Sequence, residues 1–127
     1  MKAQILLIDD ESTVRDALGT VLLRAGYAVW PAPDGHEAMA ILNRVNVDLV
    51  VTDILMPEQD GIETILKLRR LQPRMPIIAI SGGGEILPAQ YLHMAKVVGA
   101  TRLLAKPFEP ASLLGLIGEM LAVPAQG

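Results

Sequence analysis

The chain has 127 residues, of which 51% are hydrophobic and 20% charged, so we expect one domain with a filled core rather than a disordered chain. Its formal net charge is −3 and no basic run stands out, which argues against direct contact with nucleic acid. The absence of cysteine excludes disulfides and thiolate chemistry, and the absence of a signal region or a membrane-length apolar stretch predicts a cytoplasmic protein without membrane contacts.

Five segments predict strands, and in chain order they cover residues 5–8, 27–30, 49–51, 77–80 and 102–104. The first, third and fourth are short unbroken aliphatic runs followed at once by polar or glycine residues. Such runs are typical of parallel strands that are buried on both faces. The other two segments show a weaker version of the pattern.

Helical patterns lie between these segments. The clearest has apolar residues at helical spacing, which predicts an inward-facing stripe made of Val14, Ala17, Leu18, Val21 and Leu22. Two acidic N-caps precede a glutamate by three residues, as in a capping box, namely Asp34 with Glu37 and Asp60 with Glu63. Prolines suit the first turns of two later helices, at Pro88 and Pro110.

Strand and helix thus alternate five times along the chain. This alternation predicts a doubly wound α/β fold, in which an open parallel sheet carries helices on both faces. We expect one domain over residues 1–123, followed by a short tail over residues 124–127.

Polar side chains occur where the predicted strands end. Asp9 and Asp10 end the first strand, Asp53 the third and Ser81 the fourth, and Lys106 follows the fifth. Ligands bind at this edge in sheets of this kind. Three carboxylates there repel one another unless a cation joins them, and hard oxygen ligands favour Mg²⁺. A lysine and a hydroxyl can contact phosphoryl oxygens, so the set predicts a Mg²⁺-dependent phosphoryl site.

Four motifs occur in order along nearly the whole chain: "LLIDDE" (residues 6–11), "VVTDILMPEQDG" (50–61), "ISG" (80–82) and "LLAKPF" (103–108). With them the chain resembles a response-regulator receiver domain, the family of the bacterial chemotaxis regulator, which serves two-component phosphorelay signalling. The resemblance implies a flavodoxin-like fold with five helices and five parallel strands in the order 2-1-3-4-5.

The resemblance also implies a role for each acidic residue. Asp53 would accept a phosphoryl group from a phosphohistidine on a sensor histidine kinase or a histidine phosphotransfer protein. Asp10, Asp53 and the backbone carbonyl of Leu55 would bind Mg²⁺ directly, and Asp9 would bind it through water. Such a domain is not an enzyme but a phosphoacceptor signalling domain, which assists its own phosphotransfer and dephosphorylation.

The same resemblance places Lys106 and Ser81 in contact with the phosphoryl group, with Ser81 moving toward it as part of a switch. The bond between Lys106 and Pro107 is expected to be cis. In the family an aromatic residue usually lies three positions before the lysine and moves with the switch, but here that position is Leu103. We therefore expect a weaker or different conformational signal.

Three glycines follow Ser81, and they are interpreted as a hinge loop: Gly82, Gly83 and Gly84. Gly83 and Leu55 occupy the positions that flank the path of the hydrolytic water in the family. Because neither offers that water a side-chain hydrogen bond, we expect slow dephosphorylation.

The last helix carries six large apolar residues, which are Leu113, Leu114, Leu116, Ile117, Met120 and Leu121. One stripe is expected to pack on the sheet, while Leu114 and Leu121 are expected to face the other side. Together with the fourth helix and the fifth strand, this helix is expected to form a contact surface for a second copy or a target.

Several alternatives compete with this interpretation. The acidic pair could be a solvated strand end beside a helix N-cap at Ser12. A phosphohydrolase would need a second aspartate where Leu55 stands, and a P-loop would need a lysine after the glycines, so both are weak. The remaining alternative is a pseudo-receiver, a protein-interaction module that works without phosphorylation.

Overall fold

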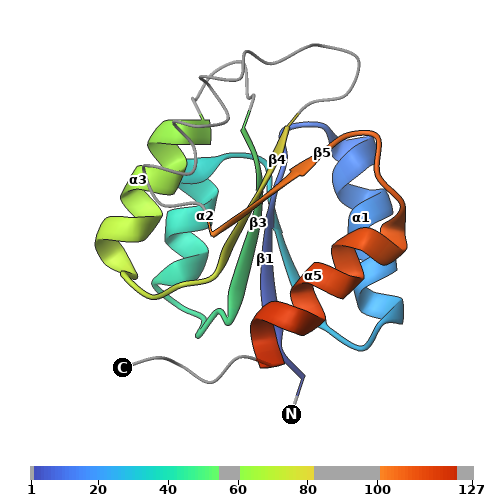
Figure 1. Cartoon of the computed structure of the whole chain (residues 1–127). Helices are drawn as coiled ribbons and strands as arrows, with labels where there is room; N and C mark the ends of the chain where they lie inside the picture. The colour runs from blue at the N-terminus through green and yellow to red at the C-terminus, as the bar shows by residue number, and fades with distance from the viewer. Residues whose placement is uncertain (1, 55–60, 82–100, 123–127) are drawn as a thin grey trace.

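The computed structural model describes residues 2–54, 61–81 and 101–122. Its elements, in chain order, are β1 (Gln4–Ile8), α1 (Ser12–Arg24), β2 (Ala28–Ala32), α2 (Gly35–Leu42), β3 (Leu49–Asp53), α3 (Gly61–Leu71), β4 (Ile77–Ser81), β5 (Arg102–Ala105) and α5 (Pro110–Ala122) (Figure 1). The strands form one parallel sheet in the order β2-β1-β3-β4-β5, which confirms the predicted topology. The helix expected to begin near Pro88 lies outside the described residues.

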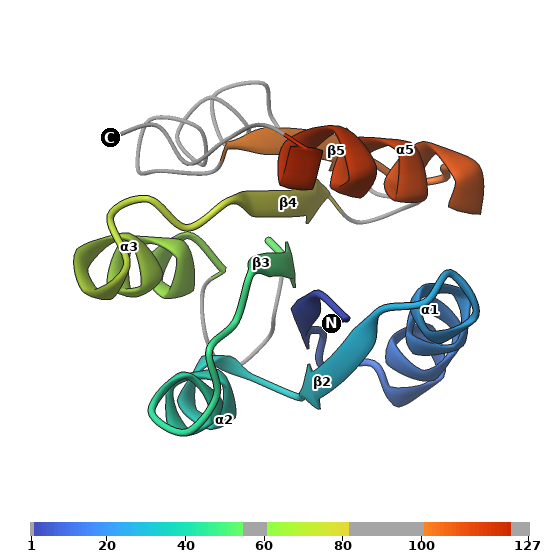
Figure 2. The same ribbon diagram turned by 90° about the horizontal axis from the view of Figure 1, so that it is seen from below.

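The sheet is covered on both faces, as Figure 2 shows from below, with α2 and α3 on one face and α1 and α5 on the other. Neighbouring residues of a strand point to opposite faces, so Leu6 and Ile8 pack on one side while Ile5 and Leu7 pack on the other. All four side chains are buried. The unbroken aliphatic run of β1 is therefore explained by burial on both faces.

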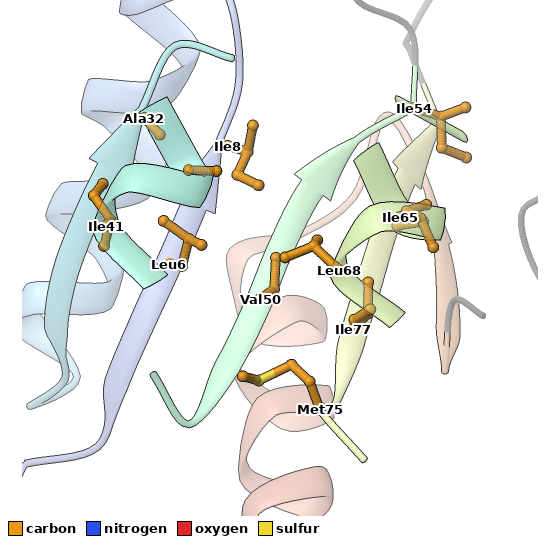
Figure 3. Close-up of a cluster of buried hydrophobic side chains, with 12 residues drawn as sticks. Leu6, Ile8, Ala32, Ile41, Val50, Ile54, Ile65, Leu68, Met75 and Ile77 are labelled. Carbon is orange, nitrogen blue, oxygen red and sulfur yellow. The ribbon is translucent and has the colours of Figure 1, made fainter. Parts of the chain in front are cut away.

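Two core clusters follow from this arrangement. The first core cluster lies toward α2 and α3 and contains Leu6, Ile8, Ala32, Ala38, Ile41, Val50, Ile54, Ile65, Leu68, Met75, Ile77 and Ala79 (Figure 3). The second core cluster lies toward α1 and α5 and contains Ile5, Leu7, Leu22, Leu49, Val51, Ile78, Ile80, Leu113, Ile117 and Met120. Burying a large aliphatic side chain contributes about 1.5–3 kcal/mol, so these clusters fix the strands against their helices.

The predicted helix ends agree with the structure where it describes them. The carboxylate of Asp34 accepts a hydrogen bond from the amide of Glu37 at 2.9 Å, so the capping residue of α2 is confirmed. Pro110 is the first residue of α5, as expected. The Asp60 cap lies outside the described residues. No helix of the described segments is long and apolar enough to cross a membrane.

Two predictions about helix faces are wrong in part. In α1, Leu22 is buried, but Ala17 is exposed, so the inward stripe is narrower than its spacing suggests. In α5, Leu114 and Leu121 do not face away from the core, because both are half-buried and pack against the second core cluster. The large exposed apolar side chains of the described residues lie on α1 and α3 instead, so the expected contact surface loses the two leucines on which it was based.

Candidate functional site

The register of the sheet brings the predicted polar residues to one edge. Ile8 of β1 lies beside Thr52 of β3, so Asp9 follows β1 at the level where Asp53 ends β3. Asp53 in turn lies beside Ile80 of β4. Ser81 pairs with Ala105, which places Lys106 directly beyond the end of β5. These positions agree with the strand ends predicted from the sequence.

Three carboxylates meet at this edge. Oxygen atoms of Asp9, Asp10 and Asp53 all lie within 4.8 Å of one another. Asp9 and Asp53 are almost fully buried, at 2% and 5% exposed, while Asp10 is exposed. Mg²⁺ prefers a few carboxylate oxygens and retains several waters, so two buried oxygens beside one solvent-facing oxygen fit this ion.

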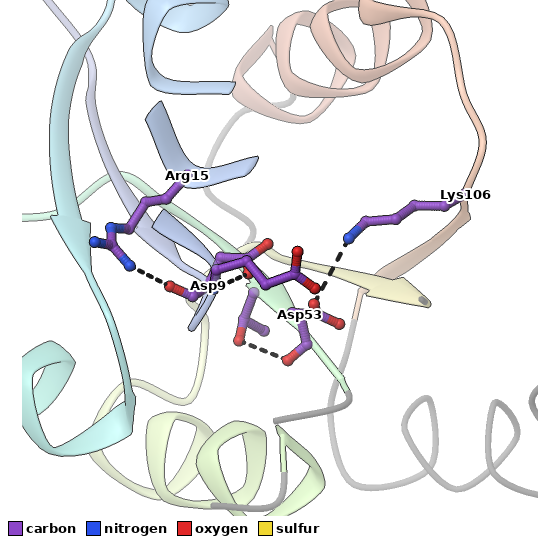
Figure 4. A network of polar contacts seen from close by, with 6 residues as sticks. Asp9, Arg15, Asp53 and Lys106 are labelled. Carbon is purple, nitrogen blue, oxygen red and sulfur yellow. Dashed lines mark hydrogen bonds and ion pairs between the residues drawn. The ribbon is translucent and has the colours of Figure 1, made fainter. Parts of the chain in front are cut away.

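Among the residues that the structure describes, one lysine faces the cluster. The Nζ atom of Lys106 lies 3.7 Å from Oδ2 of Asp53, and its side chain is only 18% exposed (Figure 4). The bond between Lys106 and Pro107 is cis, as the resemblance implies. A cation held at this distance from a buried carboxylate can also pair with an oxygen of a group bound to that carboxylate.

The carboxyl group of Asp9 is perturbed by its surroundings. Burial raises its pKa, whereas a hydrogen bond from the amide of Glu11 and the charge of Lys106 lower it, and the charges of Asp10 and Glu11 raise it again. The hydrogen bond joins the Glu11 amide to Oδ1 of Asp9 at 2.9 Å. A divalent cation stabilises the charged carboxylate, so metal binding and deprotonation of Asp9 favour each other.

The alternative that assigned the helix N-cap to Ser12 is wrong. Ser12 is the first residue of α1, and the capping position is Glu11, whose side chain makes no capping hydrogen bond. The amide of Glu11 is bound instead by the carboxylate of Asp9, two residues earlier. An aspartate at a strand end can accept such a bond because its short side chain reaches the backbone two residues on.

We predict that Asp9→Asn stabilises the metal-free protein at neutral pH. A raised carboxyl pKa means that the folded state binds the proton more tightly than the unfolded chain, so the ionised group destabilises the fold and the cost fades as the pH falls through that pKa. Asparagine keeps the oxygen that accepts from Glu11 and removes one repelling charge. We expect a gain on the order of 1 kcal/mol, which raises Tm by about 4 °C for a domain of this size.

Thermal unfolding in a chelator, at several pH values, checks this prediction. The advantage of Asp9→Asn should shrink at acid pH and again in saturating Mg²⁺, which neutralises the wild-type carboxylates. Asp16→Asn, an exposed position on α1, should leave Tm nearly unchanged. A variant that is less stable than the wild type at neutral pH in chelator would contradict the electrostatic account.

The remaining predicted site residues are not part of the carboxylate and lysine cluster described above. Leu55 and the three glycines at 82–84 lie outside the described residues. Ser81 is placed by its backbone at the end of β4. Leu103 is half-buried and packs against the first core cluster, beside Ala79 of β4.

One described residue near the cluster, Arg15, was not predicted from the sequence. Arg15 of α1 donates a hydrogen bond from Nη1 to the carbonyl oxygen of Asp9 at 2.7 Å (Figure 4). The helix dipole disfavours a basic residue in the first turn of a helix. The position of Arg15 in the predicted helix was therefore the one sign in the sequence that this side chain has a specific partner.

Comparisons with known proteins agree with this geometry. The family model described as the response regulator receiver domain matches residues 5–118. The transcriptional regulatory protein GlrR of Escherichia coli (strain K12) is 35% identical over 119 residues, which cover 94% of this chain and 26% of GlrR. The DNA-binding transcriptional regulator NtrC of Rhizobium meliloti (strain 1021) is 32% identical over 122 residues, which cover 96% of this chain and 25% of NtrC. The chain thus spans about a quarter of the length of these relatives.

Solved structures give the same result. The CheY-like response regulator receiver domain protein from Methanospirillum hungatei JF-1 has a TM-score of 0.88 and 28% identity, with coverage of 95% of this chain and 94% of its own. The chemotaxis protein CheY4 of Vibrio cholerae has a TM-score of 0.85 and 30% identity, with coverage of 94% and 98%. The chain therefore belongs to the response regulator receiver domain family, the phosphoacceptor domains of two-component signalling.

Proposed function

We propose that Asp53 accepts a phosphoryl group from the phosphohistidine of a sensor histidine kinase or a histidine phosphotransfer protein. The observation that carries this proposal is the buried Asp53 carboxylate, which lies within 4.8 Å of carboxylate oxygens of Asp9 and Asp10 and 3.7 Å from Nζ of Lys106. A carboxylate with these neighbours can act as a nucleophile toward phosphorus, because Lys106 and a bound Mg²⁺ would offset the negative charge of the phosphoryl oxygens.

In the proposed transfer, each residue of the site has a separate role. An oxygen of Asp53 forms a bond to phosphorus as the phosphorus–nitrogen bond of the phosphohistidine breaks. Lys106 then exchanges its contact with Oδ2 of Asp53 for a contact with a phosphoryl oxygen. Burial of Asp53 keeps bulk water from the reacting oxygen. Mg²⁺ bound to Asp10, Asp53 and the Leu55 carbonyl, with Asp9 holding it through water, would neutralise charge on the phosphoryl oxygens.

We also propose that the domain assists its own dephosphorylation. This reaction is proposed to be slow, because neither Leu55 nor Gly83 offers the hydrolytic water a side-chain hydrogen bond. The output signal is proposed to involve Ser81 and the glycine loop rather than a swinging side chain, because Leu103 is aliphatic and packs on the first core cluster. A contact surface formed by the fourth helix, β5 and α5, for a target or a second copy, also remains a proposal. The pseudo-receiver gains no support, since the three aspartates and the lysine are all in place.

We predict that the wild-type protein gains the mass of one phosphoryl group when incubated with Mg²⁺ and acetyl phosphate. The gain should disappear when a chelator removes Mg²⁺, because the clustered carboxylates then repel the incoming phosphoryl oxygens. Intact-protein mass spectrometry measures both results. A chain that gains no mass with acetyl phosphate or with any phosphorylated histidine kinase tested would favour the interaction module instead.

A further inference from the structure

Asp9 is held by three hydrogen bonds, two to its backbone and one to its side chain. Its amide donates to the carbonyl of Ala32 at 3.1 Å, its Oδ1 accepts from the amide of Glu11 at 2.9 Å, and its carbonyl accepts from Nη1 of Arg15 at 2.7 Å. This carbonyl belongs to the peptide that joins Asp9 to Asp10. The orientation of that one peptide therefore sets the directions in which both carboxylates leave the backbone.

Arg15 binds the turn between β1 and α1 twice. Its own amide donates to the carbonyl of Glu11 at 2.9 Å, and its guanidinium reaches back to the carbonyl of Asp9. Figure 4 shows the guanidinium on the opposite side of Asp9 from Lys106. A guanidinium is a charge-assisted donor, so this is among the stronger hydrogen bonds that a carbonyl can accept. The side chain is half-buried, which limits competition from water.

The position of Arg15 has a local cost. A cation in the first turn of a helix opposes the helix dipole, by roughly 0.3–1 kcal/mol, and α1 has no acidic residue in that turn to offset it. The hydrogen bond from its guanidinium to the carbonyl of Asp9, at 2.7 Å, is the contact that offsets this cost.

We propose that Arg15 is a positioning residue for the metal site, which holds the peptide between Asp9 and Asp10 so that both carboxylates face Asp53. This inference rests on the proposed role of the acidic cluster in binding Mg²⁺. Residues that orient metal ligands without touching the ion typically affect metal affinity by about 10–100-fold. Arg15 does not contact the carboxylate oxygens that would bind the ion. It acts less directly, because it holds the backbone from which the two carboxylates project.

The test measures Mg²⁺ binding by calorimetry on the whole chain, without a phosphodonor. Arg15→Gln and Arg15→Met are made in parallel, so that a folding failure of one does not end the test. Both are expected to raise the Mg²⁺ dissociation constant about tenfold. Arg24→Gln, an exposed arginine in the last turn of the same helix, should bind Mg²⁺ as the wild type does. Arg15→Lys, which keeps one donor of similar reach, should recover part of the affinity.

A second measurement separates positioning from stability. The NMR signal of the Glu11 amide, which reports the turn beside Asp9, should move in the metal-free Arg15 variants and stay in place in Arg24→Gln. If the Arg15 variants lose thermal stability but keep the wild-type dissociation constant, Arg15 is a structural residue and the inference is wrong. If the wild type itself binds no Mg²⁺, the proposed function fails first and the inference fails with it.

Discussion

Asp53→Asn is expected to take up no phosphoryl group from acetyl phosphate and Mg²⁺ under conditions that modify the wild type fully. An amide oxygen is too weak a nucleophile to attack phosphorus at a useful rate, although asparagine has nearly the same shape as aspartate. The variant should keep its fold without metal, because the relief of repulsion among three carboxylates within 4.8 Å opposes the loss of the ion pair with Lys106. Intact-protein mass spectrometry after a fixed incubation gives the result directly.

The matched control lies at the other end of the same strand. Asp48 immediately precedes β3, is exposed, and accepts a hydrogen bond from the amide of Gln4 through Oδ2 at 2.7 Å. Asp48→Asn should take up the phosphoryl group as the wild type does. The mass gain should also be lost on treatment with hydroxylamine, which cleaves acyl phosphates. Modification of Asp53→Asn at the wild-type rate would place the acceptor elsewhere and contradict the assignment.

Lys106→Met is expected to slow phosphorylation by about 10²–10³-fold without weakening Mg²⁺ binding. This is the usual loss when one preorganised electrostatic partner of a transition state is removed. Methionine retains much of the packing volume of the lysine stem, so the change is chiefly the loss of the charge 3.7 Å from Asp53. Removing a cation that competes for the same carboxylate should leave Mg²⁺ affinity unchanged or tighter.

A second ion pair in the protein provides the control. Lys67 and Glu63 of α3 are also 3.7 Å apart, but their side chains are 49% and 59% exposed, against 18% and 5% for Lys106 and Asp53. Exposed pairs contribute little, so Lys67→Met should change neither Tm nor the rate of phosphorylation appreciably. The measurements are the time course of mass gain and the Mg²⁺ dissociation constant. A Lys106→Met protein that is phosphorylated as fast as the wild type would remove the lysine from the mechanism.

The sheet and its functional edge could be predicted because each strand carries its own signal. An unbroken aliphatic run such as residues 77–80 indicates burial on both faces, and the polar residue that follows it marks the carboxyl end. Parallel topology then brings all these ends to one edge, so Asp53 and Lys106 meet although they lie 53 positions apart in the sequence. The prediction needed no knowledge of the side-chain contacts.

The contacts that escaped prediction involve the backbone. A carbonyl oxygen is present in every residue, so nothing in the sequence marks the Asp9 carbonyl as the acceptor for Arg15. Ser12 does not cap α1 for a similar reason, because the path of the turn places Glu11 at the capping position and brings the carboxylate of Asp9 to the Glu11 amide. Leu114 was misplaced because helical spacing gives a direction but does not show how wide a stripe its neighbours cover.

The end of the second strand was also not predicted correctly, and the residue concerned, Pro31, affects the edge of the sheet. It was predicted over residues 27–30, but β2 continues through Pro31 to Ala32, and Pro31 lies beside Leu7 of β1. The amide of Ala28 donates to Ala3 and the carbonyl of Ala32 accepts from Asp9, so even-numbered residues of β2 direct their polar groups toward β1. Pro31 therefore faces outward, where it has no N–H to offer.

An outermost strand with a free row of donors and acceptors is a template on which another chain can add a strand and aggregate. Pro31 removes one donor from that row at a position where the sheet itself needs none. A residue that obscured the end of the strand in the sequence thus protects the β2 side of the sheet against unwanted growth.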